Sequence, residues 1–267
     1  MSFEIWRTCS ISLPPTLAQA YPSKPITVVV PYAPGGGVDI VTRIVTQDLA
    51  TALGQSVIVD NKPGASTNIG MSAVARAPAD GYTLLTASPT LASNGALFKN
   101  LGFDPGADFT AIGKIGYAPL VIVVPVAYKG GSPAITDLLG GRISFMSINP
   151  LEVLAHIQAG KLRALAVYGS KPTDALPDLP TTASLGWPRL DATVWWGLVG
   201  PKGLAADVVA RLNAELQKTL ARPDVQDKLA TRGAIVETGS AAQFDAFNRT
   251  EISKWTQVIK DAGIQAD

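Results

Sequence analysis

The sequence predicts an α/β fold of two domains, in which helices cover sheets that are rich in parallel strands. Short apolar segments that suit buried strands alternate three times with helical segments or loops between residues 26 and 90. The chain has 267 residues, of which 47% are hydrophobic, which is enough for one large core or two smaller ones. An extended aromatic run at residues 193–199 suits a strand that leads from a second region back to the first.

The first strand and helix are joined by a turn that contains three consecutive glycines. The run Ile26–Val30 is entirely apolar, which is typical of a strand buried on both faces. A helix is predicted from Val38, with Asp39 in its first turn and Gly54 as its stop. Glycines before a helix leave backbone amides free, and the helix dipole favours negative charge, so the turn predicts a seat for a small anion. The alternative is that the glycines only allow a tight turn.

The glycine turn lacks the features of the two common nucleotide-binding motifs. No lysine follows the glycines, as a phosphate-binding loop requires. Ile40 stands where the last glycine of a dinucleotide-binding turn is needed. The sequence therefore favours a small anion other than a nucleotide.

Two further polar loops are expected at the same edge of the sheet. The strand at residues 57–59 precedes a loop that ends in residues 66–68, and the strand at residues 82–86 precedes the loop at residues 87–90. The loops after neighbouring parallel strands line one crevice. None of the loops contains arginine, so amide and hydroxyl donors would hold the anion, which suits a carboxylate. The alternative for residues 66–68 is that they only cap a helix.

The second region continues the alternation of strands and helices. Strands are predicted at residues 120–124, 143–146 and 162–167, and helices at residues 134–139 and 151–159. In the returning strand, alternation puts Trp195 and Trp196 on opposite faces, so that one ring can fill the core while the other faces a cleft. Two strands that cross between the domains would form a hinge. The last third is predicted to be helical, and Ser240 with Gln243 forms a capping box.

Composition and residue types argue against several functions. A formal net charge of +1 without long runs of like charge argues against a nucleic-acid surface. The single cysteine, Cys9, leaves the rest of the chain without a disulfide or a thiol nucleophile. The single histidine, His156, has no Gly-x-Ser-x-Gly segment to pair with, and it is interpreted as a structural residue. No cluster has metal-ligand spacing, so we expect neither an enzyme nor a cofactor.

The N-terminus carries a partial export signal. Leu17-Ala18-Gln19-Ala20 resembles the small-x-small site at which a signal peptidase cuts, so residues 1–20 are predicted to be a secretory signal peptide or its remnant. The alternative is a plain N-terminal tail, because the preceding residues make a poor apolar stretch.

Several blocks of sequence resemble one family in the same order. They are YPSKPITVVVPYAPGGGVDIVTRIV, VIVDNKPGASTNIGMSAVARAPADGYTLL, YKGGSPAITDLLGG, HIQAGKLRALAV and WWGLVGPKG. From Tyr21 to nearly the last residue, the chain resembles the substrate-binding proteins of tripartite tricarboxylate transporters, also called Bug receptors. The resemblance implies a monomeric, type II-like periplasmic binding protein that has no cofactor. Such a protein captures a small organic mono- or dicarboxylate and delivers it to a membrane permease.

The resemblance also implies the domain boundaries and the site. Domain 1 would contain residues 21–118 and 200–267, and domain 2 residues 119–199. In relatives, the ligand's carboxylate lies against loops that match residues 34–37, 66–68 and 88–90. The candidate ligand-binding residues are Tyr32, Pro34, Gly35, Gly36, Gly37, Asp39, Ser66, Thr67, Asn68, Ser88, Thr90, Tyr128, Asn149 and Trp196.

The chain departs from the family at two points. Relatives usually have about 50 further residues, a βαβ portion with a loop for the second half of the ligand seat, where Ala127 runs directly into Tyr128 here. Either the protein lacks this portion or the sequence omits it. The sheet edge that its loss would uncover favours omission. Ile148 stands where relatives often have an acidic or small polar residue, which argues against an amino group on the ligand.

Two other classes of function remain as alternatives. A hydrolase or nucleotide-dependent transferase would need a nucleophile or a phosphate-binding motif that the sequence does not offer. The ligand-sensing half of a regulatory protein can share a two-domain plan. It would need a helix-turn-helix segment and a basic face, and the first twenty residues are too short for that segment.

Overall fold

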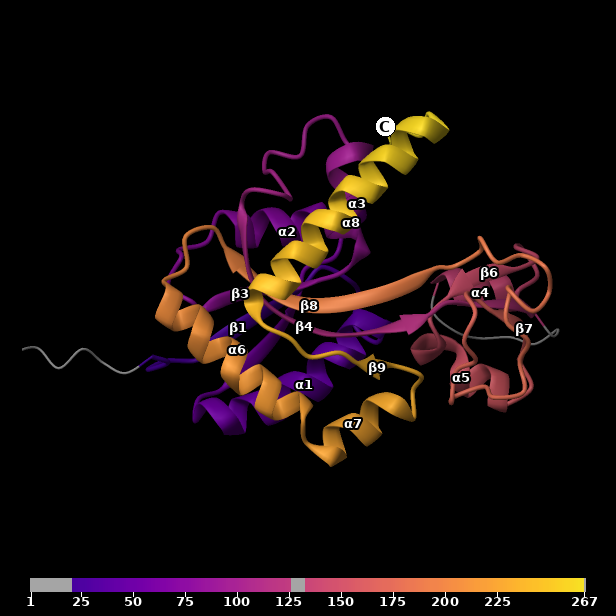
Figure 1. Ribbon diagram of the computed structural model, residues 1–267, viewed down its shortest axis with the longest axis horizontal. Coiled ribbons are helices and arrows are strands. Elements are labelled where there is room, and N and C mark those ends of the chain that lie inside the picture. Colours follow the sequence, from indigo (N-terminus) through magenta and orange to yellow (C-terminus); the bar gives the residue numbers. More distant parts are fainter. Residues whose placement is uncertain (1–20, 126–132, 267) are drawn as a thin grey trace, which may run out of the picture.

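The computed structural model describes residues 21–125 and 133–266. They form a large lobe around a six-stranded sheet and a small lobe around a three-stranded sheet (Figure 1). The large sheet consists, in spatial order, of β2 (Val57–Asn61), β1 (Ile26–Val30), β3 (Thr83–Ala87), β8 (Thr193–Pro201), β4 (Phe109–Pro119) and β9 (Ile235–Val236).

The parallel half of the large sheet is the part that the sequence predicts most directly. β1 lies between β2 and β3 and pairs with both in parallel, so the loops after all three strands meet at one edge of the sheet. The other half is antiparallel, since β8 pairs with β3 and β4, and β4 pairs with β9, in that sense. The carboxyl edge of β1 is therefore the place where a site can form.

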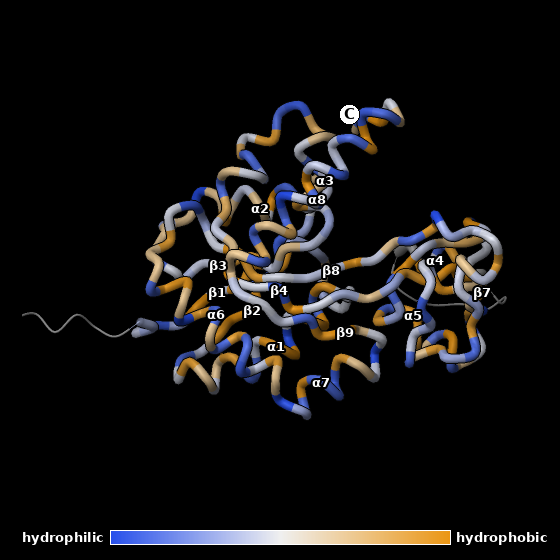
Figure 2. The backbone as a smooth tube through the Cα atoms, viewed as in Figure 1, coloured by the Kyte–Doolittle hydropathy of each residue, from blue (hydrophilic) through white to orange (hydrophobic). Residues whose placement is uncertain are grey.

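Helices cover both faces of the large sheet (Figure 1). The helices of one face are α1 (Gly37–Leu53), α6 (Ala206–Leu220) and α7 (Pro223–Ala230), and those of the other are α2 (Asn68–Ala75), α3 (Pro89–Leu97) and α8 (Ala241–Ala262). Figure 2 shows apolar and polar residues alternating along these helices. Two predicted helix ends are confirmed: α1 stops at Gly54 with φ 67°, and Ser240 and Gln243 form the capping box of α8.

The small lobe contains the sheet β6 (Met146–Ile148), β5 (Val121–Pro125) and β7 (Leu162–Val167), together with α4 (Pro133–Leu139) and α5 (Pro150–Gln158). Both strand pairs are antiparallel, so the parallel strand pairs of the described residues lie in the large lobe. The strand expected at residues 143–146 begins only at Met146. Before it, Ile143 and Phe145 are 38% and 63% exposed, beside a sheet edge without a further strand among the described residues.

Two long strands connect the lobes, as the sequence predicts. β4 and β8 pair from Phe109 with Pro201 to Pro119 with Thr193 and lead out of the large lobe toward the small one (Figure 1). The expectation that one of two neighbouring tryptophans faces the cleft is wrong. Trp195 and Trp196 do lie on opposite faces of the sheet, but each is 1% exposed because helices cover both faces. Trp196, a predicted ligand residue, is thus a core residue.

Some expectations concern residues outside the described ranges. The predicted signal peptide at residues 1–20 and the predicted ligand residue Tyr128 both lie there, as does the junction after Ala127. Within residues 21–125 and 133–266, no helix combines the length and the apolar character required to cross a bilayer.

Candidate ligand-binding cleft

A cavity of about 570 Å³ lies between the β1–α1 turn of the large lobe and α5 of the small lobe. Its lining consists of Tyr32, Ala33, Pro34, Gly35, Gly36, Gly37, Val38, Ile135, Asn149, Glu152, His156 and Val194. Six of the predicted ligand residues belong to this set: Tyr32, Pro34, Gly35, Gly36, Gly37 and Asn149. The structure therefore brings the glycine turn together with a residue more than a hundred positions away in the chain.

The glycine turn is held from behind by Asp39. Its carboxylate accepts hydrogen bonds from the Gly35 amide at 2.9 Å, from Arg43 Nε at 2.9 and 3.0 Å, and from Asn61 Nδ2 at 2.9 Å. Asp39 is only 3% exposed. Gly35 has φ 83°, a conformation that glycine adopts without strain. The structure thus shows Asp39, a predicted ligand residue, bonded to the turn itself and outside the cavity lining.

The contacts of Asp39 make the stability of the turn depend on pH. Burial acts to raise the pKa of Asp39, but the hydrogen bonds from Arg43, Gly35 and Asn61 together lower it below its ordinary value. A lowered pKa stabilises the fold above the unfolded pKa, and this contribution is lost as the pH falls through the folded pKa.

We expect Asp39→Asn to lower the free energy of unfolding at pH 7 by about 1.5–3 kcal/mol, because a buried charged acceptor is lost. The gap between wild type and variant should begin to shrink below about pH 4, where Asp39 of the unfolded wild-type chain binds a proton. It should keep shrinking as the pH falls toward the lower pKa of the folded state. Urea unfolding of both proteins between pH 3 and pH 7 measures this difference in the free energy of unfolding. A gap that stays constant over this range would contradict the assignment.

Fewer amides of the turn are free than the three glycines suggest. The Gly35 amide donates to Asp39, and the Gly36 amide lies 3.5 Å from the Ala33 carbonyl oxygen. The amides of Gly37 and Val38 belong to the first turn of α1, where a helix has no internal acceptor for them. These two donors, at the positive end of the helix dipole, are the best placed to bind an anion.

Three hydroxyl groups tie the turn after β1 to the loop after β3. Tyr32 Oη lies 2.9 Å from Ser88 Oγ and 3.1 Å from Thr90 Oγ1, and Ser88 Oγ lies 3.0 Å from Thr90 Oγ1. Burial, above all, raises the pKa of Tyr32, and the charge of Glu152 adds to this effect. Ser88 and Thr90 are thus joined to the cavity through Tyr32 and do not line it themselves.

The loop after β2 has a strained backbone but lies beside a different cavity. Ala65, Ser66 and Thr67, which form the 3₁₀ turn η1 (Ala65–Thr67), all have positive φ, an unusual state for residues other than glycine. Asn94 of α3 holds this loop by donating to the Ser66 carbonyl oxygen at 2.7 Å and to Asn68 Oδ1 at 2.8 Å. Ser66 and Asn68 line a cavity of about 660 Å³, and no residue from 66 to 68 lines the cleft.

The wall of the cleft that α5 provides is the part that sequence reasoning missed. Asn149 stands at the N-cap position of α5, without a capping hydrogen bond from its side chain, and Glu152 and His156 follow at helical spacing. The three side chains therefore share one face. Glu152 was not predicted, and His156, interpreted as structural, lines the cavity. The available signal was a polar stripe on an otherwise apolar helix, but sequence alone does not show what such a stripe faces.

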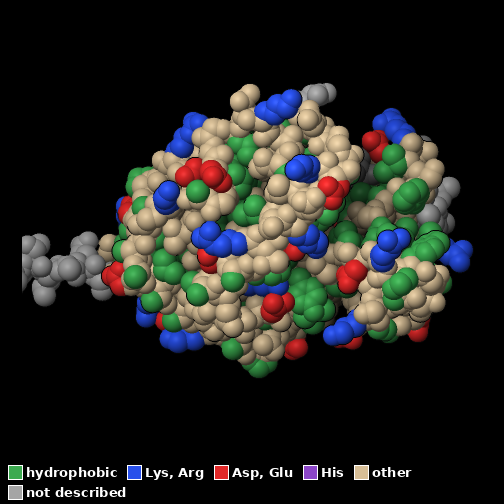
Figure 3. All heavy atoms as spheres, turned by 45° about the horizontal axis from the view of Figure 1, so that its top comes forward, with side chains coloured by type: hydrophobic (Ala, Val, Ile, Leu, Met, Phe, Trp, Pro, Cys, Tyr) green, Lys and Arg blue, Asp and Glu red, His purple; other side chains and the backbone are tan. Residues whose placement is uncertain are grey.

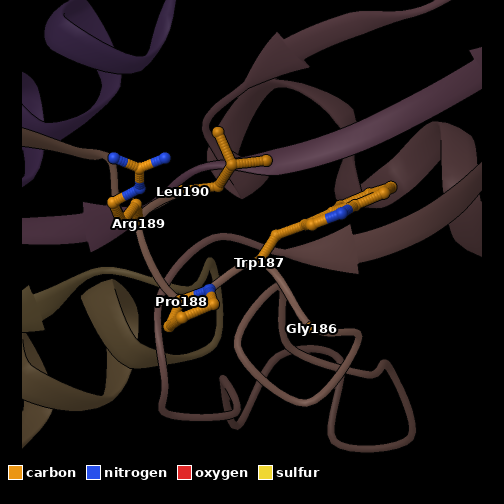
Figure 4. Close-up of a pocket in the computed structure, with 5 residues that line it drawn as sticks. All are labelled: Gly186, Trp187, Pro188, Arg189 and Leu190. Carbon is orange, nitrogen blue, oxygen red and sulfur yellow. The ribbon is translucent and has the colours of Figure 1, made fainter.

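The described residues also form a further cavity and a surface of mixed charge. A cavity of about 440 Å³ is lined by Gly186, Trp187, Pro188, Arg189 and Leu190 alone, and Figure 4 shows that all five belong to one loop. On the face in Figure 3, basic and acidic side chains are interspersed, and none of the clusters has the size of a nucleic-acid surface. Among the described residues, no three side chains are grouped as metal ligands.

Known proteins are similar to this chain in sequence and in fold. The chain is 30% identical to protein BugT of Bordetella pertussis over 301 residues, with 93% of this chain and 92% of BugT covered. A structure of Rpa4515 of R. palustris with adipate superposes with a TM-score of 0.86 at 28% identity, covering 92% of this chain and all of that one. MatC of Rhodopseudomonas palustris with bound malate superposes with a TM-score of 0.83 at 26% identity, covering 90% of this chain and 100% of MatC.

A family model confirms the relationship along most of the chain. The model described as "Tripartite tricarboxylate transporter family receptor" matches residues 41–127 and 126–264, in two segments that meet at the junction after Ala127. Further fold neighbours are described as a periplasmic binding protein, BugD, and as a TctC solute-binding protein of Polaromonas, so these similarities support the receptor class and not an enzyme class. The chain belongs to the tripartite tricarboxylate transporter receptor family.

Proposed function

We propose that this protein is a periplasmic receptor that captures a small organic mono- or dicarboxylate between its lobes and delivers it to a membrane permease. The observation that carries the proposal is the cleft itself, because Gly37 and Val38, the first residues of α1, line its cavity. The amides of a first helical turn have no acceptor within the helix and suit an anion. The relatives solved with malate and with adipate support the same ligand class. The interspersed surface charges in Figure 3 agree with a small ligand better than with a polyanion.

Capture would involve movement of the lobes about the strands that connect them. Domain 1 is proposed to contain residues 21–118 and 200–267, and domain 2 residues 119–199. β4 and β8 form the described connection between the two sheets, so small dihedral changes in them can open and close the cleft. Closure would remove water from the anion seat and strengthen each hydrogen bond to the ligand. We expect residues 1–20 to be a signal peptide or its remnant, and the mature protein to be a monomer.

We also propose that the natural protein has a segment after Ala127 that is present in relatives and is omitted from this sequence. The alignment with BugT spans 301 residues, which exceeds the 267 residues of this chain, and the family match is divided at residues 126–127. Within the described residues, β6 is an edge strand and Phe145 beside it is 63% exposed, which agrees with a missing neighbour. The intact mass of the mature protein, purified from the periplasm, tests this point and the site of leader cleavage together.

Isothermal titration calorimetry with a panel of short mono- and dicarboxylates tests the function. We expect at least one acid to bind with a Kd in the micromolar range, about −8 kcal/mol, because a few amide and hydroxyl donors hold it without a cation. The same acid should raise the thermal midpoint of unfolding, since it binds only the folded state. A protein of verified mass that binds none of the panel would refute the proposal.

A further inference from the structure

Three polar side chains of α5 face the anion seat across the cleft. Asn149, Glu152 and His156 all line the cavity, opposite the glycine turn. A Cβ atom added to Gly37 would lie 2.8 Å from Asn149 Oδ1, so Asn149 approaches closely to the first residue of α1. The two walls of the cleft are therefore near enough for one small ligand to touch both.

The hydrogen bonds of Asn149 leave one acceptor unused. Its Nδ2 donates to Glu152 Oε1 at 2.7 Å, and this orientation is fixed because a carboxylate can only accept. Asn149 is 9% exposed, and its Oδ1 is buried without a hydrogen-bond partner. A buried acceptor without a donor is costly, and a donor group on a ligand would remove that cost.

Glu152 adds a negative charge to the same wall. Within the described residues, Asn149 provides the one hydrogen bond that the Glu152 carboxylate accepts. The carboxylate acts across the cleft, because its charge adds to the effect of burial in raising the pKa of Tyr32. Among the described residues, those that line the cavity include neither lysine nor arginine.

The walls thus differ in chemistry. The glycine turn offers amide donors, whereas Asn149 Oδ1 and Glu152 offer acceptors. Ile148, the apolar residue that argued against an amino group on the ligand, is 8% exposed and does not line the cavity, whereas Glu152 one turn later does. The acidic group that the sequence seemed to lack at the cleft is therefore present at another position.

We infer that the α5 wall, through Asn149 and Glu152, selects carboxylic acids that carry a hydrogen-bond donor, an ammonium or a hydroxyl group, at the end opposite the carboxylate. A dicarboxylate would place its second charge against Glu152, and an unsubstituted acid would leave Asn149 Oδ1 unpaired. This inference rests on the proposed function, because it assigns the ligand class of the same cleft.

Calorimetry with acids of matched length tests the inference. The four-carbon set is butyrate, 4-hydroxybutyrate, 4-aminobutyrate and succinate, and the six-carbon set is hexanoate, 6-hydroxyhexanoate, 6-aminohexanoate and adipate. In at least one set, the wild type should bind the hydroxy or amino acid about tenfold or more tightly than the diacid. A preference for the amino acid over the hydroxy acid would identify an ammonium group as the donor.

Two variants assign the preference to the wall. Glu152→Gln, which keeps the shape and removes the charge, should reduce the preference over the diacid by about tenfold. Glu237→Gln removes a charge that pairs with Lys114 outside the cavity lining. This variant should bind the acids in the same order of affinity as the wild type. Circular dichroism and thermal midpoints check that both variants fold.

The outcomes separate the two proposals. If the wild type binds no acid in either set or in the wider panel, the proposed function fails and the inference fails with it. If acids bind, but the wild type prefers the diacid or Glu152→Gln leaves the order unchanged, only the inference is overturned.

Discussion

Replacing Gly37 with alanine is expected to weaken carboxylate binding by about tenfold or more, because the new methyl group would occupy the contact between the two walls of the cleft. The added Cβ would lie 2.8–2.9 Å from Oδ1 and Nδ2 of Asn149. Asn149 cannot easily move away, because it is buried at the start of α5 and bonded to Glu152. The methyl group would therefore push the start of α1 away from the start of α5 or displace the ligand.

The fold itself should tolerate this change. Gly37 is the first residue of α1, it lacks the positive φ of Gly35, and alanine favours a helix by about 1 kcal/mol over glycine. Gly95→Ala is the matched control, because it is also a glycine of a helix and its Cβ would have an ordinary contact of 3.5 Å with Pro105. Calorimetry and thermal melts should show lost binding in Gly37→Ala alone. Equal binding by both variants would contradict the proposed geometry.

The largest expected loss of stability comes from Trp195→Ala, at about 3–5 kcal/mol in the free energy of unfolding. Trp195 is 1% exposed, and its ring makes edge contacts with Phe244 at 6.0 Å and Phe247 at 5.3 Å between ring centroids. Its Nε1 also donates to Glu251 Oε2 at 3.3 Å. Removing the ring would leave a cavity between β8 and α8 and would leave Glu251 with one fewer donor.

Trp187→Ala provides the control for this prediction, because the same substitution is made on a side chain that is 57% exposed (Figure 4). Trp187→Ala should change the free energy of unfolding by no more than about 0.5 kcal/mol. Urea unfolding followed by far-ultraviolet circular dichroism suits both variants, since it does not depend on tryptophan fluorescence. Comparable losses in the two variants, or a loss below about 1 kcal/mol in Trp195→Ala, would refute the assignment of Trp195 to the core.

Much of the site could be predicted where the signal is local. The glycine turn between an apolar strand and an amphipathic helix identified one wall of the cleft, and Asn149 was identified through the family resemblance. Roles within the turn could not be predicted so well. Asp39 and Trp196 have residue types common in ligand sites. Asp39 is instead bonded to Gly35 and Arg43, each four residues away, and to the more distant Asn61, while Trp196 is buried beneath helices.

The polar wall of α5 shows where local patterns become insufficient. Glu152 and His156 stand on a helix whose other residues are mostly apolar, a pattern that fits solvent as well as a cleft. Their position depends on how the small lobe meets the large one. That arrangement rests on contacts between residues far apart in the chain, such as Gly37 and Asn149.

The sequence by itself determined the elements that depend on near neighbours: the β1–α1 unit, its end at Gly54 and the capping box of α8. These rest on hydrophobic spacing, glycine conformation and short-range hydrogen bonds, which a linear pattern records. Only the tertiary structure decided which side chains face one another across the cleft. Glu152 meets the anion seat because the paired strands β4 and β8 connect the lobes and place α5 opposite α1, a long-range arrangement that local periodicity does not encode.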